Sequence, residues 1–138
     1  MANYYANCRT NYFKVKDNDA FELAMAPIPD IEVIITPGTM EYCILGNNED
    51  GRGWPVWIQG VESDTEIEID LPNMVAEHLQ DGEVAIFMEV GNEKLRYLNG
   101  YATAINNKGE RRDIGLNDIY DIAKELTNKP EPISMASY

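Results

Sequence analysis

The alternation of apolar and polar residues along the chain predicts several short strands interrupted by short helices. Segments with period-two alternation or continuous apolar character, bounded by turn residues, are typical of strands. The expected strands cover residues 10–16, 31–36, 40–45, 54–58, 61–71, 84–90, 95–105 and 111–114. Pro55 removes a hydrogen-bond donor, so residues 54–58 are predicted as an edge strand or a packed loop.

Three helix signals lie between these strands. Asp17 is placed to cap a helix that runs through Met25, and Pro72 suits the first turn of a second helix. The second helix is expected to end at Gly82, with an apolar stripe of Met74, Val75, His78 and Leu79. Asn117 is expected to cap the third helix, whose stripe is Ile119, Ile122, Ala123 and Leu126.

This order of elements predicts an α+β fold, a mainly antiparallel sheet with two or three short helices packed on one face. Residues 84–90 are apolar on both faces and are expected to form a central strand. A tight turn at Gly91 and Asn92 would place Glu89 opposite Lys94. Residues 1–127 are expected to form a single domain, and residues 128–138, with two prolines, a loosely ordered tail.

Charge is distributed unevenly along the 138 residues. The chain has 24 acidic and 11 basic residues, a net charge of −13. Residues 17–93 hold 18 of the acids and a single basic residue, Arg52, whereas residues 94–138 carry a net charge of +1. Such a protein repels nucleic acids and anionic membranes at long range, so a cationic protein is the expected partner, unless the charge serves solubility alone.

The acids are densest between Val61 and Leu71. In a strand, the five carboxylates Glu62, Asp64, Glu66, Glu68 and Asp70 would share one face, opposite Ile67, Ile69 and Leu71. Same-face carboxylates would stand about 6.6–6.8 Å apart, too far for all five to bind one metal ion. The row is expected either to resist edge-to-edge aggregation or to engage a basic surface, with Glu49 and Asp50 as further contributors.

The polar loop 46–53 only superficially resembles known ligand loops. As a phosphate-binding loop it has Arg52 and Gly53 where Lys and a hydroxyl residue are required. As a calcium loop it has Gly46 and Trp57 where acidic ligands are required. We therefore expect a surface loop and no cofactor.

Other candidate chemistry is sparse. His78, the only histidine, is expected at the edge of the core with a hydrogen-bonded ring, and together with Cys8 and Cys43 it matches no zinc-ligand spacing. Core packing accounts for Tyr12, Phe13 and one of Trp54 and Trp57, although these aromatics together with Tyr4 and Tyr5 could line a binding surface.

The cellular compartment is predicted from the absence of targeting and membrane-spanning signals in the sequence. The first residues show no basic region followed by an apolar run, and no apolar stretch is long enough to span a membrane. Two cysteines do not make a disulfide framework, so the expected location is the cytoplasm, with reduced thiols.

Three stretches, residues 11–17, 89–101 and 115–120, together carry a resemblance. In them the chain resembles small acidic proteins of bacterial phages, prophages and integrative mobile elements. The resemblance implies a mobile-element context, in which some acidic proteins mimic DNA against restriction or CRISPR systems. It implies no site residues.

These observations predict a non-enzymatic acidic protein that binds a basic protein surface, for example as a DNA mimic or an anti-defence protein. The expected partner-binding residues are Glu62, Asp64, Glu66, Glu68, Asp70, Glu49, Asp50, Trp54 and Trp57. The alternative is a homo-oligomeric structural or accessory protein, in which an apolar edge at the two tryptophans forms a homodimer. An enzyme that uses His78 and the thiols is a third hypothesis.

Overall fold

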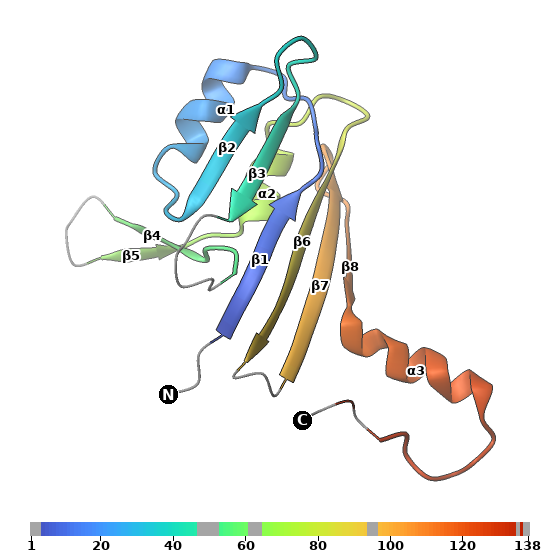
Figure 1. Ribbon diagram of the computed structural model, residues 1–138. Coiled ribbons are helices and arrows are strands. Elements are labelled where there is room, and N and C mark those ends of the chain that lie inside the picture. The colour runs from blue at the N-terminus through green and yellow to red at the C-terminus, as the bar shows by residue number, and fades with distance from the viewer. Residues whose placement is uncertain (1–3, 47–52, 61–64, 94–96, 135, 137–138) are drawn as a thin grey trace.

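The predicted strands assemble into one large antiparallel sheet and a separate small one. A computed structural model describes residues 4–46, 53–60, 65–93, 97–134 and 136. The six-stranded sheet has the order β2-β3-β1-β6-β7-β8, and β4 pairs only with β5 (Figure 1). The strands are β1 (Tyr4–Thr10), β2 (Ile31–Ile35), β3 (Tyr42–Gly46), β4 (Trp57–Gln59), β5 (Glu66–Glu68), β6 (Val84–Glu93), β7 (Tyr97–Asn106) and β8 (Arg111–Gly115).

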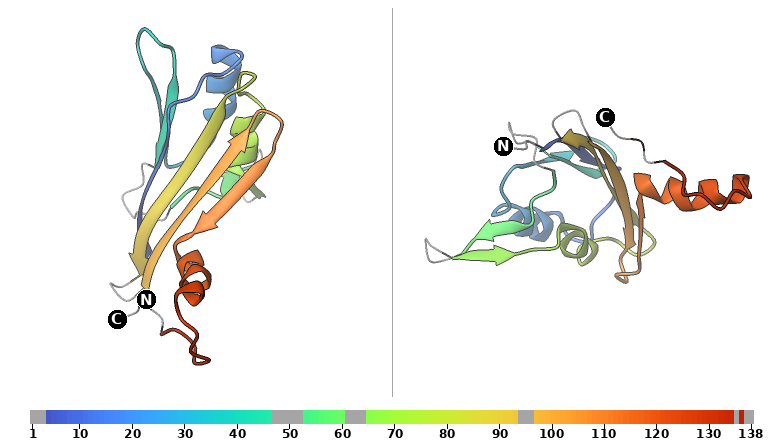
Figure 2. Two further views of the ribbon diagram at one scale, coloured as in Figure 1. Left: turned by 90° about the vertical axis from the view of Figure 1, so that its right-hand side faces the viewer. Right: turned by 90° about the horizontal axis from the view of Figure 1, so that it is seen from below.

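The helices lie on opposite sides of this sheet. They are α1 (Asn18–Met25), α2 (Leu71–Ala76) and α3 (Ile119–Ala123), the last flanked by the 3₁₀ turns η1 (Leu116–Asp118) and η2 (Lys124–Leu126). Helices α1 and α2 cover one face, here called the inner face, whereas α3 projects from the opposite, outer side (Figure 2). The α+β class with a mainly antiparallel sheet is therefore confirmed, with α1 and α2 as the helices packed on one face.

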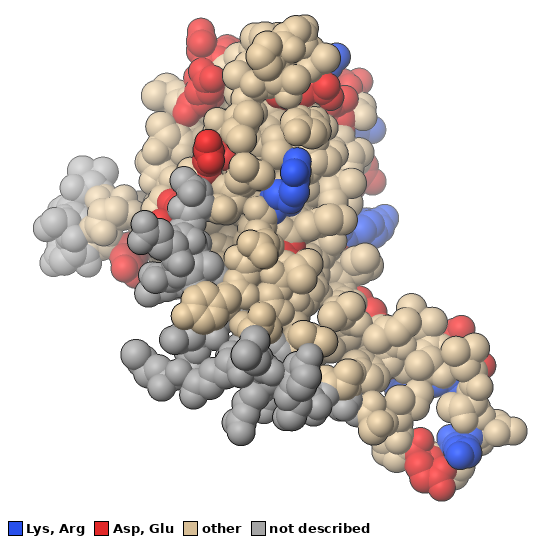
Figure 3. Space-filling model, viewed as in Figure 1, with Lys and Arg blue, Asp and Glu red and all other residues tan. Residues whose placement is uncertain are grey.

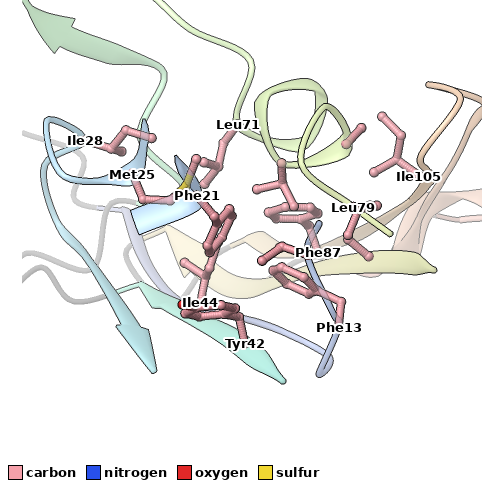
Figure 4. Close-up of a cluster of buried hydrophobic side chains, with 14 residues drawn as sticks. Phe13, Phe21, Met25, Ile28, Tyr42, Ile44, Leu71, Leu79, Phe87 and Ile105 are labelled. Atoms are coloured by element: carbon pink, nitrogen blue, oxygen red, sulfur yellow. The ribbon is translucent and has the colours of Figure 1, made fainter. Parts of the chain in front are cut away.

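The hydrophobic core lies between the inner face and these two helices (Figure 4). Phe21 of α1 is fully buried, and its ring centroid lies 4.8 Å from that of Tyr42 and 5.8 Å from that of Phe13. Helix α1 begins as predicted, because the Asp17 side chain accepts a hydrogen bond from the Ala20 amide at 3.1 Å. The buried side chains of α1 are those of Phe21 and Met25, and they hold the helix against the sheet.

Several predicted boundaries are wrong. The first strand ends at Thr10, and Phe13 and Val15 beyond it make only isolated bridges to Tyr42 and Leu79. Helix α2 ends at Ala76, so Leu79 is buried without belonging to the helix. The third helical segment starts with η1 at Leu116, so Asn117 lies inside it and does not cap it.

The predicted turn at Gly91 is also wrong. Strand β6 continues through Glu93, and Glu89 pairs with Tyr101 and not with Lys94, which lies outside the described residues. Gly91 has a different role: a Cβ atom there would collide with the Tyr5 carbonyl oxygen and lie 2.8 Å from the Ala6 Cα. Glycine therefore permits the close approach of β1 to β6. The expectation that residues 84–90 form a central strand is confirmed, since β6 lies between β1 and β7.

The inner side of the sheet makes the fold sensitive to alkaline pH. Burial, and a hydrogen bond donated to Glu22 at 3.0 Å, raise the pKa of Tyr42 from 10.0 to about 12. The unfolded chain therefore ionises first, and folding free energy is lost as pH rises from about 10 towards 12, at up to about 1.4 kcal/mol per pH unit for one proton. We expect Tyr42→Phe to flatten this decline in urea unfolding between pH 8 and about 12.

A matched control is available nearby. Leu23 is 77% exposed and carries no ionisable group, so Leu23→Ala should leave the pH dependence as in the parent protein. Equal slopes for the two variants would contradict the assignment to Tyr42.

Candidate functional site

The small hairpin formed by β4 and β5 is the clearest candidate for a binding element. It stands away from the large sheet (Figure 1). Its register pairs Trp57 with Glu68 and Gln59 with Glu66, and these residues share one face because directly opposed residues point to the same side. Trp57 is 48% exposed, and both glutamates are exposed. The hairpin therefore presents to solvent an indole directly opposite the Glu68 carboxylate, with Glu66 on the same face.

The opposite face of the hairpin anchors it. Ile58 and Ile67 are directly paired there, and Ile58 packs against the core while Ile67 remains 49% exposed. Ile69 also packs against the core, and Leu71 is 2% exposed. The predicted alternation of acidic and isoleucine faces thus holds over β5, but Ile67 contributes less to the core than expected.

The predicted row of five carboxylates is shorter in the structure. Glu66 and Glu68 lie on one face of β5 and make no ion pair within the described part of the chain. Asp70 lies outside the strand: its side chain accepts from the Asn73 amide as the cap of α2, and Arg111 Nη1 donates to both its oxygens at 3.0 Å. Glu49, Asp50, Glu62 and Asp64 lie outside the described residues.

Trp54 contributes to the interior rather than to an exposed aromatic edge. Its ring packs edge-on against Phe87, with centroids 5.4 Å apart, and its indole Nε1 is buried without a hydrogen-bond acceptor in the described part of the chain. The expectation of core packing is therefore met by Phe13 and by Trp54 as the one tryptophan, but it is wrong for Tyr12, which is 52% exposed. Trp57 is the tryptophan left for contact with a partner.

A hollow of about 460 Å³ lies between the root of the hairpin and β7. Its walls include Trp54, Glu68, Asp70, Thr103 and Arg111. Arg111 is held by Asp70 and also by Asp113, whose Oδ1 lies 3.2 Å from Arg111 Nε. A hydrogen bond from Thr103 and the charge of Arg111 lower the pKa of Asp113, so this wall carries fixed charge at neutral pH.

Glu89 is a buried carboxylate that the sequence analysis did not select as a site residue. It is 5% exposed, and its Oε1 accepts from the Trp54 amide and the Tyr101 hydroxyl, both at 2.9 Å. A Cβ atom on Gly53 would collide with this carboxylate. Glu89 therefore fastens the segment that leads into the hairpin onto the large sheet. The available signal was one acid within an otherwise apolar central strand.

The cysteines and the histidine form no reactive group. Cys8 donates to Glu89 at 3.5 Å, and burial together with this carboxylate raises the pKa of Cys8 from 9.0 to about 12, so the thiol stays protonated at neutral pH. Cys43 is buried and free, and Arg9 Nη2 lies 3.4 Å from its sulfur. His78 packs edge-on against Phe21 at the border of the core, as expected, but the expected hydrogen bond of its ring is not found among the described residues. No cluster of metal-ligating side chains occurs among the described residues.

Within residues 4–46, 53–60, 65–93, 97–134 and 136, no helix is long and apolar enough to cross a bilayer. No family model, curated protein or solved structure matches the chain. The geometry of the hairpin and of the large sheet therefore supplies the evidence on function.

Proposed function

We propose that this chain is a non-enzymatic binding protein that uses the β4–β5 hairpin to engage a basic segment of another protein. The observation that carries the proposal is the exposed pairing of Trp57 with Glu68, next to Glu66. An indole face attracts lysine and arginine cations, by about 0.5–1 kcal/mol at an exposed site, and an adjacent carboxylate adds a charged hydrogen bond. The hollow beside Glu68 leaves room for the partner's side chain.

The charge of the whole chain supports the same class of partner. A net charge of −13 accelerates encounter with cationic proteins and makes their binding sensitive to salt. A DNA-binding protein of a host defence system is the particular partner that a mobile-element origin would suggest. If the hairpin acts as a DNA mimic, duplex DNA should displace the captured partner in a competition assay.

The test measures binding of a fluorescent nona-arginine peptide at low and high salt. We expect Trp57→Ala combined with Glu66→Gln and Glu68→Gln to weaken binding at least about fivefold, which corresponds to roughly 1 kcal/mol. The matched control is Glu32→Gln with Glu125→Gln, two exposed acids outside the hairpin that give the same change in charge. We expect this control to weaken binding less than about twofold.

Equal weakening in both variants would contradict a hairpin site. It would instead show that net charge alone attracts the peptide, as expected if the acids only maintain solubility. The homo-oligomeric alternative then remains, but not through an edge formed by both tryptophans, because Trp54 packs inside.

A further inference from the structure

The outer face of β6, β7 and β8 is largely apolar, and neither α1 nor α2 covers it (Figure 2). Register places alternate residues of β6, β7 and β8 on this face, among them Met88, Ala102 and Ile114 in one cross-strand row. Met88 is 52% exposed and Ile114 is 67% exposed. A soluble protein rarely leaves such a row in contact with water unless a partner covers it.

Helix α3 extends this apolar surface beyond the sheet. The segment formed by η1, α3 and η2, residues 116–126, is here called the helical arm. A groove of about 420 Å³ runs between the strands and this arm. It is lined by Met88, Val90, Ile114, Leu116, Ile119 and Ile122, and Leu126 continues the stripe at 88% exposure. The predicted apolar stripe of the third helix is therefore real, but it is not buried in the core.

The distribution of charge indicates what covers the face. On β6, β7 and β8, the described outer-face side chains include one charged group, Arg112, and no acid. Acidic side chains lie at the α1 end and again on the projecting α3 segment, whereas the surface between these two regions is largely uncharged (Figure 3). Asp118 is the one acid among the described residues that line the groove, and its Oδ2 accepts from the Gly115 amide, so a strongly basic partner would find few carboxylates to pair with between the strands and α3. For two chains of −13, contact through this apolar face keeps the acids at the α1 end of each copy apart.

The amount of apolar surface suits a pair of identical chains. Eight large side chains here are between 50% and 88% exposed: Met88, Val90, Leu98, Ile114, Leu116, Ile119, Ile122 and Leu126. At about 60–100 Å² each they offer roughly 500–800 Å² per copy. A standard protein interface buries about 800 Å² per partner. In a dimer with two-fold symmetry, both copies contribute the same residues to the interface.

We infer that the outer face of β6–β8 and α3 is a homodimer interface, in which the helical arm of each copy covers the groove of the other. The arm projects from the body and carries its apolar stripe on residues outside the core. This surface is separate from the hairpin, so a dimer would leave both hairpins free to bind. The inference stands whether or not the hairpin function is correct.

Sedimentation equilibrium of the full chain tests this inference. We expect a dimer with a dissociation constant of about 1–10 µM, and at least about 100-fold weaker association for Ile114→Asp with Ile122→Asp. Leu126→Asp is a second variant and should weaken association about tenfold. Because Leu126 is 88% exposed, this substitution should not disturb folding, so weaker association would report on the interface itself. Leu23→Asp, 77% exposed on α1, is the control and should dimerise as the parent does.

Two results would overturn the inference. One is a parent protein that stays monomeric up to about 100 µM, which would mean that the arm folds onto its own sheet or awaits a different partner. The other is a dimer that survives the paired aspartates but dissociates with Trp57→Ala, which would move the interface to the hairpin.

Discussion

Replacing Phe21 with alanine is expected to lower the free energy of unfolding by about 4 kcal/mol. Phe21 is 0% exposed and contacts three rings, those of Phe13, Tyr42 and His78, at centroid distances of 5.8, 4.8 and 5.8 Å. These rings come from the chain preceding α1, from β3 and from the segment after α2. Loss of the Phe21 ring therefore leaves a cavity where three parts of the fold meet.

The same helix provides the control for this prediction. Leu23 is 77% exposed, so Leu23→Ala should change stability by no more than about 0.5 kcal/mol. Urea unfolding monitored by circular dichroism measures both variants, at one fixed chain concentration because association adds to apparent stability. A loss below about 1.5 kcal/mol for Phe21→Ala would mean that this aromatic cluster is not the centre of the core.

The elements that could be predicted from the sequence are those with local signals. Asp17 at the start of α1, the apolar strand around Phe87 and the alternation in β2 each carry their signal within a few residues. Their positions were therefore close to the observed ones. The α+β class followed from the order of these elements, without knowledge of which strands pair.

The errors arise where a residue's role depends on a distant segment. Gly91 suggested a turn, but it is required by the approach of β1, more than eighty residues earlier in the chain. Val15 alternates like a strand residue, yet it bridges to Leu79 and lies outside β1. The stripe of α3 was read correctly, but periodicity cannot show whether an apolar stripe meets its own core or another chain.

The candidate site was only partly predictable for the same reason. The acidic run and Trp57 are recognisable in the sequence as candidates for binding. That Trp57 lies opposite Glu68 depends on the register of β4 with β5, which the sequence does not reveal. Asp70 was grouped with the other acids because its spacing fits the alternation. Its partner Arg111 is forty-one residues away and could not be assigned from spacing.

Replacing Glu89 with alanine is expected to lower the free energy of unfolding by about 3 kcal/mol, the second largest effect. The substitution removes the acceptor for the Trp54 amide and the Tyr101 hydroxyl, two part-buried donors, and it leaves a cavity where the carboxylate was. Glu89→Gln is the matched variant. It keeps a carbonyl oxygen for these donors and should cost about 1 kcal/mol.

The structural consequence of Glu89→Ala can be observed at Trp54. In a Trp57→Phe background, Trp54 is the only tryptophan, so its fluorescence reports directly on the segment that Glu89 fastens. We expect a shift to longer wavelength in the alanine variant, because the indole loses its packing against Phe87, and no shift with glutamine. If alanine costs less than about 1 kcal/mol and the emission is unchanged, Glu89 does not anchor the hairpin. If the emission shifts, and if Glu89→Ala with Trp57 retained also weakens peptide binding, the buried carboxylate positions the binding face that Trp57 and Glu68 present.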